Sequence, residues 1–238
     1  MQVSAHRNEQ EKSRDHAKVL SIAARMFLEK GYEAASVRQI AAAAGINVNT
    51  MVRDFGNKEN ILCELVEYVL TGQFSAAKAM IGGTTEDSVL YYAAETALQL
   101  HMAEYSEAVR NLYCAAYSLS DTSELILKDV AEKMIVPIFS PYLPGASPSD
   151  FYQLEIASGS IIRGYMTVRC DASFTIDQKV ERFLEAALRV YRVPEEKIAE
   201  AKEFVKRFDY PAIAAKTIED MLAMLQQATH STPVPKEE

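Results

Sequence analysis

Apolar positions recur along most of the 238-residue chain at the three- and four-residue spacing of an amphipathic helix. In residues 13–30 one such stripe consists of Val19, Ile22, Ala23, Met26 and Phe27. No stretch alternates apolar and polar residues for long enough to form a half-buried strand. The pattern therefore predicts an all-α protein with helices at 13–30, 37–44, 48–54, 58–80, 86–103, 105–118, 122–140, 149–170, 176–192, 195–208 and 211–228.

Residues 36–58 contain two short predicted helices that are separated by Gly45. Ser36 is a natural N-cap for the first helix, and Gln39 stands three residues later, where it completes a capping box. Asn47 is the natural N-cap of the second. Two short helices joined by a tight turn are typical of a helix-turn-helix, whose second helix enters a groove of the nucleic acid.

The remaining pattern divides the chain into four parts. The polar start predicts a flexible N-terminal arm at 1–12, and residues 13–57 form the expected three-helix domain that contains the helix-turn-helix. Residues 58–228 form a larger helical domain, interrupted by a proline-rich loop at 141–149 and by Pro137, which should kink or end a helix near Val136. The polar, proline-containing end predicts a disordered tail at 229–238.

Charge and motif content narrow the functional classes. The net charge is −8, but residues 1–60 carry +2 and the rest −10, which fits a protein that touches phosphate at one end. The three cysteines are far apart, so we expect neither a disulfide framework nor a metal site. The sequence has no common catalytic or nucleotide-binding motif, signal peptide or long apolar span, so we expect a cytoplasmic protein without enzymatic activity, cofactor or membrane segment.

The residue types and their spacing over about 13–70 resemble those of the tetracycline-repressor (TetR) family of bacterial transcriptional regulators. The corresponding residues are Phe27, Gly31, Tyr32, Ser36, Val37, Ile40, Ala41, Ala44, Gly45, Ile46, Thr50, Met51, Phe55, Asn57, Lys58 and Glu59. The resemblance implies a homodimeric repressor that binds a palindromic double-stranded DNA operator and responds to a small-molecule effector of unknown identity. It also implies that the second domain binds the effector and dimerises, with 149–170 and 176–192 at the dimer interface.

Eight residues are candidates for contact with DNA: Ser36, Arg38, Asn47, Val48, Asn49, Thr50, Arg53 and Lys58. Arginine and asparagine read base edges, small methyl groups touch thymine, and caps and lysines contact phosphate. The chain departs from the family at Val52 and Asp54, which replace aromatic residues that usually reach phosphates, and at Val48, which replaces a basic residue. These departures leave an alternative, an interaction protein on the same scaffold with weakened or lost DNA binding.

Six residues of the second domain are candidates for lining an effector cavity: His101, Tyr105, Tyr113, Tyr117, Arg163 and Tyr165. The competing interpretation is that each belongs to an ordinary core. The sequence around Arg163 is apolar, so we expect it to be buried beside Glu155, Asp171 or a ligand carboxylate. Gly159 and Gly164 lie inside a predicted helix, where close approach of another helix would explain them. Residues 195–228 add further apolar positions that need burial.

Overall fold

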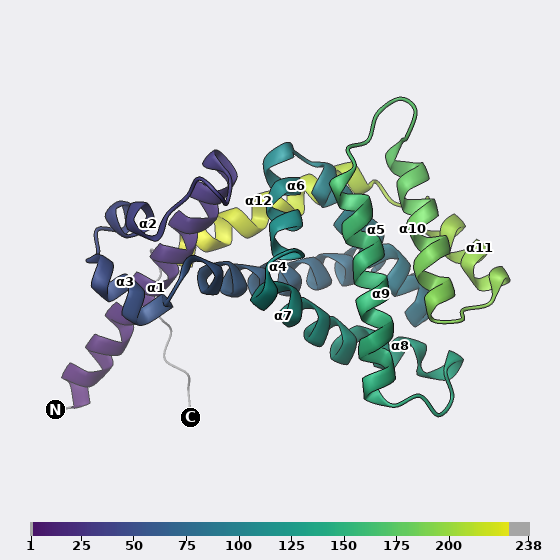
Figure 1. Cartoon of the computed structure of the whole chain (residues 1–238), viewed down its shortest axis with the longest axis horizontal. Coiled ribbons are helices and arrows are strands. Elements are labelled where there is room, and N and C mark those ends of the chain that lie inside the picture. Colours follow the sequence, from purple (N-terminus) through teal and green to yellow (C-terminus); the bar gives the residue numbers. More distant parts are fainter. Residues whose placement is uncertain (1, 229–238) are drawn as a thin grey trace.

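The computed structural model describes residues 2–228, and every regular element within that range is helical. Figure 1 shows α1, α2 and α3 at one end of an elongated molecule and the later helices at the other. The helices are α1 (Gln2–Lys30), α2 (Val37–Ala44), α3 (Val48–Phe55), α4 (Lys58–Ile81), α5 (Ser88–Glu104), α6 (Glu107–Ala116), α7 (Ser120–Val130), α8 (Val136–Phe139), α9 (Pro148–Thr167), α10 (Ile176–Val190), α11 (Glu195–Val205) and α12 (Tyr210–Ala228).

The first helix is longer than the sequence predicts. It begins at Gln2 rather than near Ser13, so most of the expected N-terminal arm is helical. No glycine or proline interrupts residues 2–30, and alanine, glutamate, glutamine and lysine, which favour helix, are frequent among them. The polarity of residues 1–12 therefore did not indicate where the first helix begins. The predicted tail at 229–238 lies outside the described residues.

The helix predicted at 122–140 is divided by a change in helical geometry. A π-helical turn at Ala131–Ile135 separates α7 from α8, and Ser140–Tyr142 forms a short 3-10 turn. The N–H of Val136 donates to the carbonyl of Ala131, five residues earlier. Pro137 follows; it has no N–H to donate, and its ring clashes with the preceding turn of a regular α-helix. The wider π-helical turn just before it relieves this clash.

Apolar side chains form two connected clusters. The cluster at the N-terminal end includes Phe27, Ile40, Met51 and Phe55, all buried, together with the first half of α4. Burial of each such side chain stabilises the fold by about 1.5–3 kcal/mol. Ala41 and Ala44 keep α2 narrow on its buried side, so α1 and α3 pack closely against it.

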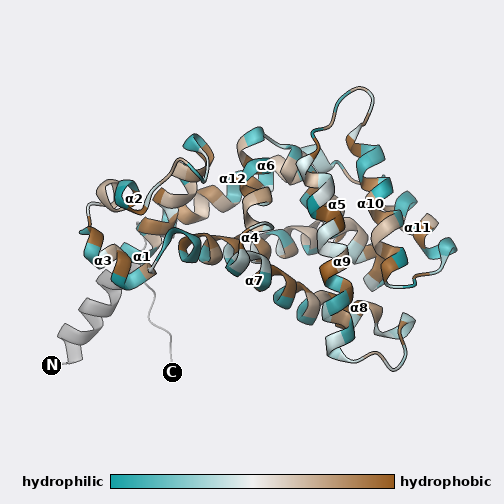
Figure 2. Cartoon of the chain, viewed as in Figure 1, coloured by the Kyte–Doolittle hydropathy of each residue, from teal (hydrophilic) through white to brown (hydrophobic). Residues whose placement is uncertain are grey.

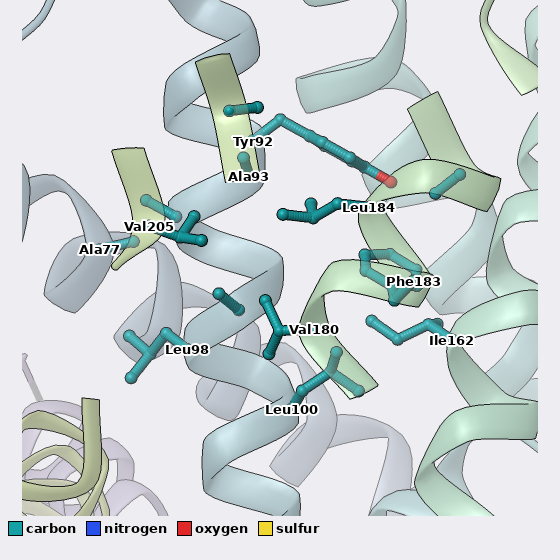
Figure 3. Close-up of a cluster of buried hydrophobic side chains, with 14 of the residues drawn as sticks. Ala77, Tyr92, Ala93, Leu98, Leu100, Ile162, Val180, Phe183, Leu184 and Val205 are labelled. Carbon is teal, nitrogen blue, oxygen red and sulfur yellow. The ribbon is translucent and has the colours of Figure 1, made fainter. Parts of the chain in front are cut away.

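The larger cluster lies at the other end of the molecule, where α5 is surrounded by α4, α9, α10, α11 and α12. Figure 2 shows apolar residues concentrated where these helices face one another. In Figure 3, Leu100 of α5 lies near Val180 of α10. Nearly the whole of α5 is buried, including the polar residues Glu95, Thr96 and Gln99.

Two long helices connect the clusters. The residues Ile61 and Leu65 of α4 belong to the N-terminal cluster, whereas Ala77 and Ile81 belong to the larger one. The last helix, α12, runs back from the larger end and packs on α1, α4 and α5 (Figure 1). The apolar residues of α11 and α12 that needed burial are thus covered within the same chain.

Candidate nucleic-acid interface

The turn between α2 and α3 is built from local capping interactions. The hydroxyl oxygen of Ser36 accepts from the Gln39 N–H at 3.2 Å, and the Gln39 side chain accepts from the Ser36 N–H at 3.0 Å. Gly45 ends α2 with a φ of 72°, a left-handed conformation that glycine adopts without strain. Asn47 then starts α3, and its side-chain oxygen accepts from the Asn49 N–H at 2.8 Å.

The helix α3 has a buried side and an exposed side. Met51 and Phe55 are buried in the N-terminal cluster. On the opposite side, Asn49 and Arg53 are exposed and one helical turn apart, and Val52 beside them is 51% exposed. Val52 was not among the eight predicted DNA contacts; from the sequence it was noted only as the replacement of an aromatic residue that is usual in the family. Its four-residue spacing from the exposed Val48 is the signal that places both on one surface.

Arg53 and Asp54 neutralise each other at the surface of α3. Arg53 Nε donates to one carboxylate oxygen of Asp54 at 2.7 Å, and an Nη donates to the other at 3.0 Å. Asp54 also holds the pKa of the Arg53 guanidinium above its usual value, through the hydrogen bond and its charge. In this conformation the guanidinium that was predicted to contact phosphate is engaged by its neighbour.

The candidates on α2 and α4 differ in their surroundings. Arg38 is exposed on α2, whereas Ile40 and Ala41 of the same helix are buried. Lys58 at the start of α4 is half-buried, and its Nζ donates to the Tyr32 carbonyl at 2.8 Å and lies 4.0 Å from the centre of the Tyr32 ring. Lys58 therefore ties α4 to the turn after α1, and its contact with phosphate stays a prediction.

A histidine that the sequence analysis did not select joins three helices of this region. The His16 ring of α1 stacks on Phe55 of α3, with 4.4 Å between ring centres, and its Nε2 hydrogen-bonds the Glu64 carboxylate of α4. This contact holds the end of α3 against α1 and α4. The residue lies near the start of the predicted helix, where nothing in its spacing distinguishes it from a surface histidine.

The second domain contains an apolar cavity of about 100 Å³ next to this region. Its walls come from α1, α4, α5, α6, α7 and α12, and include Leu28, Leu65, Val69, Leu112, Ile218 and Met221. Of the six predicted effector contacts, Tyr113 and Tyr117 line it. The sequence reasoning missed the aliphatic walls because nothing distinguishes them from ordinary core positions.

The other four predicted contacts lie outside this cavity. His101 stacks on Tyr210, and burial lowers the pKa of His101 to about 4. Tyr105 is exposed, and Tyr165 packs on Phe174.

The expectation that Arg163 is buried is wrong. Its side chain is exposed, whereas its neighbour Ile162 is buried. Glu155 instead accepts a hydrogen bond from Tyr191, and Asp171 caps the turn that contains Ser173. Successive helical residues differ by about 100° in direction, so apolar neighbours in sequence do not imply burial.

Among the described residues, no group of three or more histidine, cysteine, aspartate or glutamate side chains is arranged to hold a metal ion. None of the helices in residues 2–228 is long and apolar enough to cross a bilayer.

Comparison with known proteins gives one family match. Residues 19–65 match the family model described as bacterial regulatory proteins, tetR family. This segment contains the C-terminal part of α1, all of α2 and α3, and the first part of α4, so it includes the exposed α3 surface and the helices that pack against it. The match implies a DNA-binding transcription regulator rather than an enzyme. No curated protein matches the chain.

Proposed function

We propose that this TetR-family protein is a homodimeric, ligand-responsive repressor that acts on bacterial DNA in the cytoplasm. The observation that carries the proposal is the exposed side of α3, where Asn49 and Arg53 stand opposite the buried Met51 and Phe55. A helix held in this way by α1 and α2 can enter a major groove while its supporting helices contact the backbone.

Each exposed residue then has a separate role in binding. Asn49 pairs with an adenine edge, and Val48 and Val52 contact thymine methyl groups. Ser36 and Arg38 contact phosphate near the start of α2, where the helix N-terminus also favours an anion. Thr50, Asn47 and Lys58 complete the predicted surface along the phosphate backbone.

The outer side of α9 is the best-supported dimer interface. Ile156 is 43% exposed there, and Ser160 and Gly164 follow at helical spacing. A side chain at Gly164 would meet nothing within 4 Å in the same chain, whereas one at Gly159 would meet Leu127 at 3.1 Å. Gly159 therefore serves packing within the subunit, and Gly164 is free for close approach of a second copy.

For two copies of α3 to enter successive major grooves, dimerisation through α9 must place them about 34–36 Å apart. The effector would act through α4, which contacts both apolar clusters and lines the cavity. A ligand shifts the equilibrium only if it binds the two arrangements of α4 with different affinity. The apolar cavity between α1, α4 and α12 provides a place where that difference can arise.

A gel shift with the DNA upstream of the protein's own gene tests the proposal. The wild-type chain should retard this DNA, and replacing Arg38 and Asn49 together by alanine should abolish the shift. Lys216→Ala is the matched control, because Lys216 is an exposed cation on α12. Unchanged binding by the double variant would show that the α3 surface has been assigned wrongly.

A second function, protein–protein interaction with weak DNA binding, is favoured by the Arg53–Asp54 pair. This pair removes the net positive charge of α3 that would otherwise attract phosphate. Absence of DNA binding even at low salt, together with a stable protein partner in a pull-down, would support this alternative over the repressor.

A further inference from the structure

Two carboxyl groups are buried in the second domain without a cationic partner. Glu95 of α5 is 2% exposed and Glu155 of α9 is 5% exposed. In the described part of the chain neither forms an ion pair; the Gln73 side-chain amide donates to Glu95, and the Tyr191 hydroxyl donates to Glu155. Both line a small cavity of about 20 Å³ together with Tyr92.

Burial of these carboxyls opposes their ionisation. Removal from water raises the pKa of Glu95 to about 7 and that of Glu155 to about 7, and the charge of Glu95 adds to the shift of Glu155. The titratable side chains that face them are tyrosines, which burial keeps neutral by raising their pKa: Tyr91, Tyr92, Tyr113, Tyr117, Tyr191 and Tyr210.

A purely structural role does not explain this arrangement. Well-packed apolar residues of similar volume usually stabilise a core as much as buried charges or more. A buried carboxylate also has room for several hydrogen bonds, and each of these two receives one from a neutral donor. A cation at this site would therefore supply the charge partner that the ionised form of each carboxyl lacks.

The small polar cavity adjoins the apolar cavity described above. Leu70, Gln99 and Tyr117 line both of them. The Gln99 side-chain amide donates to the Tyr117 hydroxyl at 2.8 Å, so these two residues form a polar boundary between the spaces. An apolar cavity of about 150 Å³ is known to hold benzene, so the larger space is of the right order for one ring or a short alkyl chain.

We propose that the two cavities form one effector site for a small organic cation, with its apolar body in the larger cavity and its ammonium group at Glu95 and Glu155. The proposal rests on the ligand-responsive repressor described above and names its ligand class. A neutral analogue would leave the carboxyls without a charge partner, and an anionic one would be repelled.

The same carboxyls are connected to the helix that leads to the DNA-binding end. Gln73 is a fully buried polar residue in the middle of α4. It donates to Glu95 and accepts from the Tyr113 hydroxyl at 2.9 Å. A cation at Glu95 competes with the Gln73 amide for the carboxylate. Binding would therefore displace Gln73 and shift α4.

Calorimetry on the full-length wild-type chain tests the ligand class with three probes of similar shape: benzylammonium, benzyl alcohol and benzoate. We expect benzylammonium to bind at least roughly tenfold more tightly than the alcohol at pH 8, since a buried charge pair contributes strongly to affinity. Benzoate should not bind. The preference for the amine should decrease at pH 6, where the carboxyls are protonated while the amine stays charged.

Variants locate the site. Glu95→Gln and Glu155→Gln should each reduce benzylammonium affinity by at least roughly tenfold and leave benzyl alcohol unaffected. Glu203→Gln is the control, because Glu203 is an exposed carboxylate on α11. Equal affinity for amine and alcohol, or no binding of any probe at millimolar concentration, would overturn the proposal even if a variant failed to fold, because both are wild-type results.

The outcome is separable from that of the proposed function. If the wild-type chain shifts its upstream DNA but a neutral ligand releases it and benzylammonium does not, the repressor stands and the cation site is wrong. If the chain binds no DNA but benzylammonium binds as expected, the repressor is wrong and the site stands.

Discussion

Replacement of Asp54 by asparagine should make DNA binding by this protein tighter and more dependent on salt. In the present arrangement both oxygens of the Asp54 carboxylate accept from the Arg53 guanidinium at the exposed side of α3. Asparagine is similar in shape and carries no charge, so it removes a negative group from the surface that is proposed to face the DNA phosphates. It also weakens the attachment of Arg53, which then becomes available to a phosphate.

The size of the effect follows from counterion release. Each phosphate that a protein neutralises contributes about −0.9 to the slope of log affinity against log salt. With one new Arg53 contact from each subunit of a dimer, the slope should become steeper by about 1.8. On lowering the salt fourfold, the affinity of Asp54→Asn should therefore rise about 12-fold more than that of the wild type.

Fluorescence anisotropy with labelled upstream DNA over a salt series measures both slopes. Glu203→Gln provides the control, because it makes the same change of charge in an exposed pair, which Glu203 of α11 forms with Lys206 just after the end of that helix. Thermal unfolding should be nearly unchanged, since Arg53 and Asp54 are exposed. Identical slopes for wild type and Asp54→Asn would refute the placement of Arg53 opposite phosphate.

Two further predictions concern buried charges in the second domain. Glu104→Gln should lower the free energy of unfolding, measured by urea denaturation, by about 3–5 kcal/mol. The reason is that Lys179, which is 1% exposed, and the buried Arg110 both lose their carboxylate partner. A decrease below about 1 kcal/mol would contradict this prediction. Because burial raises the pKa of Glu95 and Glu155 from 4.5 to about 7, folding favours their protonated forms. As the pH rises from about 4.5 to 7, the free energy of unfolding of the wild type should therefore decrease by about 3 kcal/mol per carboxyl relative to that of the Glu95→Gln, Glu155→Gln double variant. Parallel curves of unfolding free energy against pH for the two proteins would contradict this prediction.

The helix-turn-helix was predictable because the interactions that define it are local. The Ser36 capping box, the left-handed Gly45 and the Asn47 cap each involve residues within a few positions of one another. The all-α class and the family resemblance of the N-terminal segment were therefore available from sequence and are confirmed. The start of α1 could not be predicted, because a polar segment without glycine or proline is compatible with either a helix or a flexible arm.

The polar site in the second domain could not be predicted in the same way. Its members, Gln73, Glu95, Tyr113 and Glu155, come from four segments that are distant in sequence. A single glutamate in a helix is usually a solvated charge, and only tertiary packing shows that these two are buried. Arg163 shows the opposite error. Its charge within an apolar segment predicted a buried functional group, but its position on the helix exposes the side chain to solvent.

The dimensions of α4 explain why a small change in that polar site can matter for DNA. Gln73 is 15 residues from Lys58, or about 22 Å along the helix. Lys58 is attached to the Tyr32 carbonyl and ring, so the start of α4 moves with the N-terminal cluster rather than independently of it. Farther along, the Tyr68 hydroxyl donates to the Met221 carbonyl of α12 at 3.0 Å, so a shift of α4 also involves α12, which packs on α1. In the proposed dimer, a rotation of the N-terminal end would occur in both subunits, so both rotations would change the distance between the two copies of α3. Binding to successive major grooves tolerates little change in that distance.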